Sequence, residues 1–406
     1  MQDKALEVAS LAGHILLENG AEISRVEETM ERISRHYGVQ SGDFFVLSNG
    51  IFTTGSTGYA KVEFIPFKGA QLERVAAVCQ LSRDIEQDKY SLDEAYDMLL
   101  QIRTRKTKPV WEQLLGAMVG SAGFCIIFGG APLDAAAAAI VGLIVWAFVI
   151  FVSAPHLSKP VGNIAGGIVG TLFCLVFHKM GFGVNLGNMI VGSLIPLIPG
   201  VPFTNGIRDL AAEDYIAGAT RLLDAMMVFF CIAAGVAITF MADFLIEGSM
   251  TEFIGPVPDP LTGRIPFQMT AAFLGTLGFA VLFGVHRSNY IQCALVAAIG
   301  WVCYLALSRY SALGIITSTF LATTIVALLA RQFAVWFKTP ATIFLITGVF
   351  PMIPGGGIFW TAFYLVSKQL DAALQSGMQA LGITAAIVLG IIIVSALPYS
   401  IFKRRK

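Results

Sequence analysis

Long apolar stretches separated by short polar segments fill the chain from Trp111 onward. A helix needs about 20 mostly apolar residues to cross the hydrocarbon core of a bilayer. Ten stretches approach this length, and they are 111–129, 133–152, 161–177, 184–200, 225–245, 267–285, 291–307, 313–329, 342–355 and 381–397. The ninth is short and interrupted. The pattern predicts a polytopic α-helical membrane protein with about ten transmembrane helices.

The residues before Trp111 follow a different pattern. The segment EISRVEETMERISRHYG has apolar residues at helical spacing, which predicts an amphipathic helix with a capping box formed by Ser24 and Glu27. Two β-rich runs, FFVL and IFTTG, flank the hairpin signal Asn49-Gly50, and YAKVEFIPF predicts a third strand. Helical patterns return at 70–85 and 92–102. We expect a small N-terminal α/β or α+β domain.

Composition supports this division, because the chain is 56% hydrophobic and only 13% charged, and about half of the charges precede residue 110. We expect a cytosolic domain over 1–109, a first five-helix membrane repeat over 110–246, an extracytoplasmic linker over 247–266 and a second five-helix repeat over 267–406. The N-terminus is a poor signal peptide, because it lacks a basic head followed by an uninterrupted apolar core. A net charge of zero gives no reason to expect nucleic acid as a partner.

The Lys and Arg residues between the apolar stretches predict the orientation, because short cytoplasmic loops carry an excess of them. With the N-terminal domain inside, the outer segments hold only Lys179, Arg264, Arg309 and Lys368. The inner segments hold Arg103, Arg105, Lys106, Lys108, Lys159, Arg208, Arg221, Arg287, Arg331, Lys338 and the tail Lys403–Lys406. The asymmetry predicts ten spans with both termini in the cytoplasm.

Two similar proline-containing pentamers, PLIPG and PMIPG, end the fourth apolar stretch of each half. Proline removes a backbone donor and breaks a helix. Five spans is an odd number, so the second half enters the membrane from the opposite side, which predicts two inverted repeats of the kind found in secondary transporters. The alternative is chance similarity in a glycine-rich sequence. The predicted helix-break residues are Pro196, Pro199, Gly200, Pro351, Pro354 and Gly355.

A charged segment, TNGIRDLAAEDYIAGATRLLDA, follows the first break. At about 100° per residue, Asp214, Gly218, Arg221 and Asp224 share one helix face with small residues between the charges, and Asp209 and Glu213 lie on a neighbouring face. Such a polar stripe predicts the lining of a cavity for a zwitterionic ligand. The alternative is an interfacial helix whose arginines reach the headgroups and whose acids face water.

Chemical motifs for catalysis, metal binding or cofactors are missing from the sequence. It contains no HExxH, GxSxG or GxxxxGK[ST] segment, and five of its six cysteines lie in apolar runs without paired spacing. We expect no enzyme activity, no catalytic residue, no metal and no cofactor. A membrane-anchored hydrolase with a catalytic N-terminal domain is the alternative from another class.

The stretch PGVPFTNGIRDLAAEDYIAGATRLLDA strongly resembles the bacterial threonine/serine exporter family, and GAEISRVEETMERI with FFVLSNGIFTTG is similar to that family's N-terminal domain. The resemblance covers essentially the whole chain and indicates the fused form, in which the second five spans, including PMIPGGG, are similar to the family's smaller membrane component. It implies secondary export of threonine and serine across the bacterial inner membrane, driven by the proton motive force. Some split-chain relatives are linked to dicarboxylate export, which is the alternative within transport.

The family's polar segment corresponds here to Asn205, Arg208, Asp209, Gly218, Arg221 and Asp224. We expect three residues to bind substrate, with an arginine holding the carboxylate, namely Asn205, Arg208 and Arg221. The acids are the candidates for proton coupling, namely Asp209, Glu213, Asp214 and Asp224. The expected partners are threonine or serine, protons and the lipid bilayer, and the sequence is compatible with a homo-oligomer.

Overall fold

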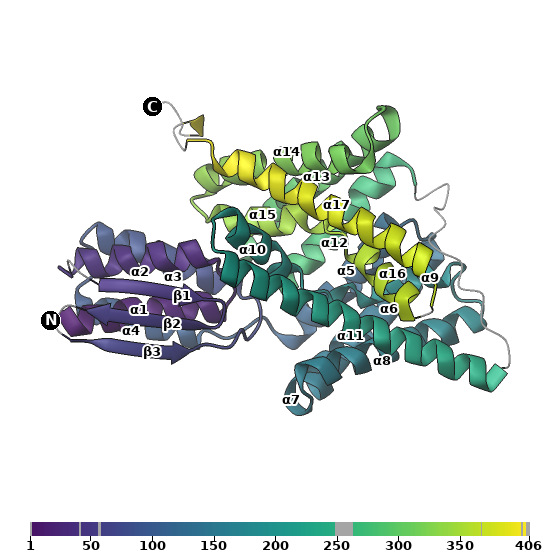
Figure 1. Ribbon diagram of the computed structural model, residues 1–406, viewed down its shortest axis with the longest axis horizontal. Helices are drawn as coiled ribbons and strands as arrows, with labels where there is room; N and C mark the ends of the chain where they lie inside the picture. Colours follow the sequence, from purple (N-terminus) through teal and green to yellow (C-terminus); the bar gives the residue numbers. More distant parts are fainter. Residues whose placement is uncertain are drawn as a thin grey trace. The chain divides into compact units, whose positions relative to one another are not determined.

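The computed structural model describes residues 2–39, 42–55, 58–247, 263–366, 368–398 and 401–402 (Figure 1). Most of the predicted linker at 247–266 and the basic tail 403–406 lie outside the described residues. The chain forms two compact units. The first, here called the head unit, contains residues 1–108, 201–224 and 283–286, and the second, the membrane unit, contains 109–200, 225–282 and 287–406. The head unit therefore includes two stretches that the sequence analysis assigned to the membrane repeats.

The head unit has two layers, with helices over one face of a small sheet. Its main elements are α1 (Gln2–Glu18), α2 (Ile23–His36), β1 (Gly42–Leu47), β2 (Gly50–Gly55), β3 (Ala60–Phe64), α3 (Leu72–Glu86) and α4 (Leu92–Thr104). The predicted helices and the three predicted strands are all present. A hydrophobic core forms between α1, α2, α3 and α4, and it also contains Ala217 from the segment after the first break.

The three strands pair antiparallel in the order β1-β2-β3 (Figure 1). The predicted hairpin is confirmed, but its ends pair as Leu47 with Gly50, so its two loop residues are Ser48 and Asn49, one position earlier than predicted. Val46 and Ile51 pair with each other and are both buried. This register keeps their side chains in the core, and a slip by one residue would turn them to the opposite face.

The predicted capping box of Ser24 and Glu27 is wrong. The N-cap of α2 is Glu22, and Ser24 lies inside the first turn. Glu27 accepts a hydrogen bond from the backbone N–H of Val46 at 3.3 Å instead, which ties α2 to β1. A capping box does form at α4, between Ser91 and Glu94.

The membrane unit consists of helices. They are α5 (Val110–Ile127), α6 (Pro132–Phe148), α7 (Ala154–His156), α8 (Lys159–Lys179), α9 (Leu186–Leu194), α12 (Ile265–Leu282), α13 (Tyr290–Tyr310), α14 (Ile315–Phe337), α15 (Ala341–Val349), α16 (Gly355–Val366) and α17 (Leu370–Ser395), together with most of α11 (Tyr215–Glu247). A π-helical turn at Val149–Ser153 joins α6 to α7. In the described residues eight helices are long and apolar enough to cross a membrane, or up to ten if each bent pair is one span. The protein is a multi-pass membrane protein, as predicted.

Both proline motifs lie at breaks with the same local structure. In the first, α9 of 9 residues leads through a 3₁₀ turn at Ile195–Leu197 into α10 (Gly200–Ala211) of 12 residues. In the second, α15 of 9 residues leads through Phe350–Met352 into α16, also of 12 residues. The two bends measure 69° and 48°. The helices before and after the break have the same lengths in both halves, so chance is a poor explanation for the similarity of the two proline motifs.

The two breaks contact each other inside the membrane unit. A Cβ atom at Gly200 would collide with the ring of Phe350, and a Cβ atom at Gly355 would lie 2.9 Å from the Ile198 side chain. Phe350 also packs against Phe279, with ring centroids 4.6 Å apart. The Phe350 ring therefore occupies the space that a side chain at position 200 would need, and the Ile198 side chain packs closely against Gly355.

Helices α5 and α12, the first helices of the two halves, approach each other through glycines. A Cβ atom at Gly123 would lie 2.6 Å from the Cα atom of Gly275, and one at Gly116 would lie 2.8 Å from the carbonyl oxygen of Gly278. Small residues of this kind allow close packing of membrane helices.

We expect Gly123→Ala to destabilise the protein by about 1–3 kcal/mol or more, because backbone atoms in front of the new methyl group cannot rotate away. The measurement is the apparent melting temperature of the purified protein in detergent. Gly356→Ala is the control, since its Cβ atom would meet only the Phe128 ring at 3.6 Å. Equal melting temperatures for the two variants would contradict the packing argument.

Candidate functional site

The predicted site residues of the charged segment lie in the head unit, on α10 and the first turns of α11. Three of them converge on the turn at Gly20–Ile23 that joins α1 to α2. The Asn205 side chain donates to the carbonyl oxygen of Gly20 at 2.7 Å, and Arg221 donates to that of Ala21 at 2.9 Å. Asp209 accepts from the backbone N–H of Ile23 at 3.0 Å. The segment after the first break thus holds a turn of the N-terminal domain.

The α1–α2 turn needs these partners because its backbone polar groups are buried. Gly20 has a φ of 88°, a conformation that favours glycine. Its N–H donates back to the carbonyl oxygen of Leu17 at 3.3 Å, and its own carbonyl oxygen accepts from Asn205. The free N–H groups at the start of α2 favour a negative charge, which Asp209 supplies. Arg221 in turn forms an ion pair with Asp209, so the buried carboxylate is balanced. Asn205, Asp209 and Arg221 are all at most 9% exposed.

Arg208, the fourth predicted residue at this place, reaches the carboxylate of Glu22 at 3.2 Å. Arg25 binds the same carboxylate at 2.7 Å. Burial by itself raises the pKa of Glu22, but the guanidinium groups of Arg208 and Arg25 outweigh it and hold that pKa at about 2. Glu22 is therefore ionised at any physiological pH, and Arg208 carries a permanent partner within the protein.

Of the remaining predicted acids, Glu213 and Asp214 lie at the junction of α10 and α11, and Asp224 lies on α11. Glu213 is exposed and has a φ of 69°, in the left-handed region. Asp214 is half-buried, and burial raises its pKa although Arg221 opposes the shift. Asp224 is also half-buried, one helical turn beyond Arg221. The structure therefore groups Asn205, Asp209 and Arg221 tightly and leaves Glu213 outside that group.

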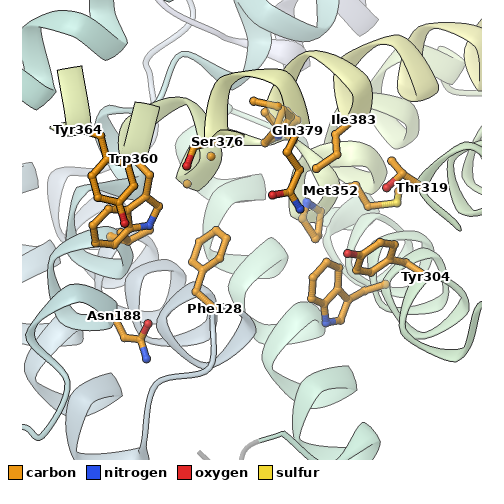
Figure 2. Close-up of a pocket in the computed structure, with 18 residues that line it drawn as sticks. Phe128, Asn188, Tyr304, Thr319, Met352, Trp360, Tyr364, Ser376, Gln379 and Ile383 are labelled. Carbon is orange, nitrogen blue, oxygen red and sulfur yellow. The ribbon is translucent and has the colours of Figure 1, made fainter. Parts of the chain in front are cut away.

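A second candidate site is a cavity of about 400 Å³ within the membrane unit (Figure 2). The second break forms one wall with Pro351–Pro354, Gly356 and Gly357. Aromatic side chains from α13 and α16 form others, including a stacked pair of Trp301 and Tyr304 with ring centroids 5.0 Å apart. Helix α17 contributes Ser376 and Gln379, which Figure 2 shows near the cavity. None of the residues that line the cavity in the described part of the chain is charged.

Asn188, the third residue of α9, lines this cavity and is fully buried. Its backbone N–H is capped by the side chain of Asn185 at 3.0 Å. Its own side-chain oxygen and nitrogen have no hydrogen-bond partner among the described residues. Leaving a buried polar group unsatisfied costs about 1–3 kcal/mol. Asn188 is therefore a strong candidate for contact with a polar ligand.

The polar residues of this cavity were not predicted from the sequence. Asn188, Tyr304 and Gln379 are isolated polar positions in apolar helices, and their convergence depends on tertiary packing. One signal was available for Asn188, because a polar residue inside a membrane span is a functional candidate by default. The clustered charges after the first break were a stronger sequence signal.

As for metals, no group of three His, Cys, Asp or Glu side chains converges within the described ranges.

Comparison with known proteins gives one consistent result over most of the chain. Residues 7–242 match the family model ThrE, described as "Putative threonine/serine exporter", and residues 268–397 match the model ThrE_2, described as "Threonine/Serine exporter, ThrE". The "Threonine/serine exporter" of Corynebacterium glutamicum is 22% identical over 402 residues, covering 96% of this chain and 81% of that protein. A Mycobacterium tuberculosis protein named "Probable threonine/serine exporter" is 20% identical over 416 residues, covering 98% of this chain and 77% of that protein. No solved structure matches the chain.

We expect Arg221→Ala to expose the backbone N–H of Ile23 to solvent exchange, because breaking a buried ion pair costs about 3–5 kcal/mol and leaves Asp209 unbalanced. Hydrogen–deuterium exchange of the peptide that spans α1, the turn and α2 measures this. The matched control is Arg35→Ala, which removes an exposed pair with Glu31 on α2, worth about 0.3–0.5 kcal/mol. Equal exchange at the turn in the two variants would refute the role of Arg221 there.

Proposed function

The chain belongs to the threonine/serine exporter family, and on this premise we propose that it exports threonine, serine and similar small hydroxy amino acids by secondary active transport. We propose the membrane-unit cavity as the place where the substrate binds. The supporting observation is a cavity beside a broken helix that offers neutral polar groups and, among the described residues that line it, no charged side chain. Broken helices beside a cavity are typical of substrate sites in secondary transporters.

The chemistry of this cavity favours an amino acid over a dicarboxylate. A zwitterion carries one positive and one negative group, and neutral dipoles of opposite orientation can satisfy both. A dicarboxylate carries two negative groups, and burying them requires nearby cations. Arg208 and Arg221 are the cations that the dicarboxylate alternative would use, and they are paired with Glu22 and Asp209.

The substrate contacts predicted for Asn205, Arg208 and Arg221 remain predictions. Their observed partners support a different role, because all three fasten the segment after the first break to the N-terminal domain. We propose that this connection transmits changes at the break to the N-terminal domain through the continuous chain. Direct binding of substrate by Arg221 would require release of both Asp209 and the carbonyl oxygen of Ala21.

For location and topology, we propose the bacterial inner membrane, ten spans and both termini in the cytoplasm. The distribution of Lys and Arg between the loops supports this orientation. The matched breaks, each in the fourth of five spans, support two repeats, and five spans per repeat would make them inverted. The bilayer is then the principal partner of the membrane unit.

We propose no enzymatic activity, since the relatives named above are exporters. The hydrolase alternative would place catalysis in the N-terminal domain. There the buried hydroxyl groups of Ser10 and Thr53 bond each other at 3.0 Å, and His14 approaches Glu63 at 3.6 Å. Glu63 also pairs with Lys61 at 3.1 Å, and these contacts within the domain favour a structural role.

Threonine transport is the direct test of the proposed function. In everted membrane vesicles with an imposed pH gradient, acid inside, we expect the full chain to accumulate labelled threonine and serine. A protonophore should abolish the accumulation, and excess succinate should not compete. Vesicles without the protein are the control. Gradient-driven uptake of succinate in the absence of threonine uptake would establish the dicarboxylate alternative instead.

Proton coupling is proposed for one of the acids Asp209, Glu213, Asp214 and Asp224, and Asp214 has the most suitable surroundings. Burial raises the pKa of both Asp214 and Asp209, but Asp214 is only half-buried, whereas Asp209 is fully buried in an ion pair with Arg221. Because the pKa is raised, the carboxyl group takes up a proton at a higher pH than a free aspartate does, which suits exchange near neutrality.

We expect Asp214→Asn to lower gradient-driven threonine accumulation at least tenfold while threonine exchange without a gradient persists, because the variant binds substrate but no proton. Comparison of the two uptake modes in the same vesicles measures the effect. Glu213→Gln is the matched control, since that neighbour is exposed. If neutralising each of the four acids in turn left the gradient dependence intact, the coupling assignment would be wrong.

A further inference from the structure

We propose that the carboxylate of the transported amino acid binds the first turn of α16, on the backbone N–H groups of Gly356 and Gly357, with the amide of Asn188 completing the subsite. This inference rests on the proposed function and specifies how the cavity recognises its substrate. It assigns the role of carboxylate partner to neutral groups, in place of the arginines that sequence reasoning favoured.

The first turn of α16 has N–H groups available for an anion. A helix leaves its first N–H groups without partners inside the helix. Here the N–H of Gly355 donates to the carbonyl oxygen of Ile353 at 2.7 Å. The N–H of Ile358 donates to the carbonyl oxygen of Pro354 at 2.9 Å. The N–H groups of Gly356 and Gly357 lie between these two, and no protein acceptor takes them within the described residues. They also carry the positive end of the helix dipole.

Both glycines line the cavity, and neither has a side chain that would lie between its backbone and the cavity. A Cβ atom at Gly356 would come no closer than 3.6 Å to another atom, the ring of Phe128, and one at Gly357 would come within 3.4 Å of Ala380. These are ordinary contact distances. The glycines are therefore not required by packing, and their effect is to let a ligand approach the backbone.

The first break supplies a natural comparison for the second. Counted from the shared Pro-Gly pair, Gly356 and Gly357 correspond to Val201 and Pro202. Pro202 has no N–H, and Val201 carries a branched side chain beside its own. Although the two breaks share their helix lengths, only the second presents two adjacent N–H groups without side chains. Because both breaks interrupt a helix but differ at these two positions, the two glycines at the second break are not needed to break the helix, and we assign them to anion binding.

Asn188 gives the independent indication of a ligand. It is fully buried, both polar atoms of its side chain lack partners among the described residues, and it lines the same cavity (Figure 2). Its counterpart in the second half, by the same count, is Ile343, so the repeat architecture does not require a polar residue at this position. An amide can donate to the substrate carboxylate and accept from its ammonium group. The aromatic faces of Trp301 and Trp360 suit the cation.

The test compares two substitutions of one residue. Gly357→Pro removes the proposed donor and installs the residue that the first break has at this position, while Gly357→Ala keeps the N–H and adds one methyl group. Proline is tolerated in the first turn of a helix. The probes are L-threonine and L-threoninol, an analogue in which a hydroxymethyl group replaces the carboxylate, measured as inhibitors of labelled serine uptake by the full chain in vesicles.

We expect Gly357→Pro to lower the affinity for threonine about 10-fold or more relative to Gly357→Ala, because a hydrogen bond to a charged group is lost. Threoninol should bind wild type weakly and should not distinguish the two variants. Asn188→Leu is the second variant, for use whether or not the proline variant folds, and it should lower the ratio of threonine affinity to threoninol affinity. These results would support the subsite.

Two outcomes separate this inference from the function on which it rests. If wild type transports threonine and the affinity ratio is unchanged in Gly357→Pro or in Asn188→Leu, the carboxylate subsite is refuted and the exporter function stands. If wild type transports neither threonine nor serine, the proposed function fails and the subsite fails with it.

Discussion

The structure depends on one constraint. The hydrocarbon core of a membrane offers no hydrogen-bond partner to the backbone N–H and C=O groups that a broken helix leaves unpaired. Non-helical backbone at membrane depth is tolerated only where protein buries it or a cavity uses it. The two breaks meet this constraint together, because Gly200 accommodates the ring of Phe350 while Gly355 accommodates Ile198. Each break thus packs against part of the other. At the second break, Gly356 and Gly357 line the cavity. The glycine contacts between α5 and α12 bring the two halves close enough for this arrangement.

The helices after the two breaks occupy equivalent positions in the repeats but carry opposite kinds of side chain. Counted from the shared motif, Asn205 corresponds to Trp360, Arg208 to Phe363 and Asp209 to Tyr364. On α10 the polar members bind the α1–α2 turn of the head unit. On α16 the aromatic members pack in an apolar cluster that includes Phe359 and Val228. One local architecture therefore serves attachment in the first half and a cavity in the second.

Local patterns in the sequence predicted most of the fold and little of the site. Apolar length predicted the spans, proline and glycine predicted both interruptions, and alternating β-rich runs predicted the sheet, since each signal lies within a few residues. The placement of the charged segment was beyond local reasoning, because the partner of Asp209 is Ile23, 186 positions earlier. Local sequence patterns did not predict the cavity either. Asn188 is a single amide among apolar residues, and its significance appears only when α9, α13, α16 and α17 converge.

The contacts between the α1–α2 turn and the charged segment also determine when the N-terminal domain can finish folding. The N-terminal residues leave the ribosome long before Arg208 and Arg221 do, and by then four apolar stretches have followed them. Until that moment the carboxylate of Glu22 has Arg25 but lacks Arg208, and the carbonyl oxygens of Gly20 and Ala21 lack the side-chain donors Asn205 and Arg221. Packing of the head unit is therefore completed only after the first four apolar stretches have been synthesised, because the unit includes residues 201–224.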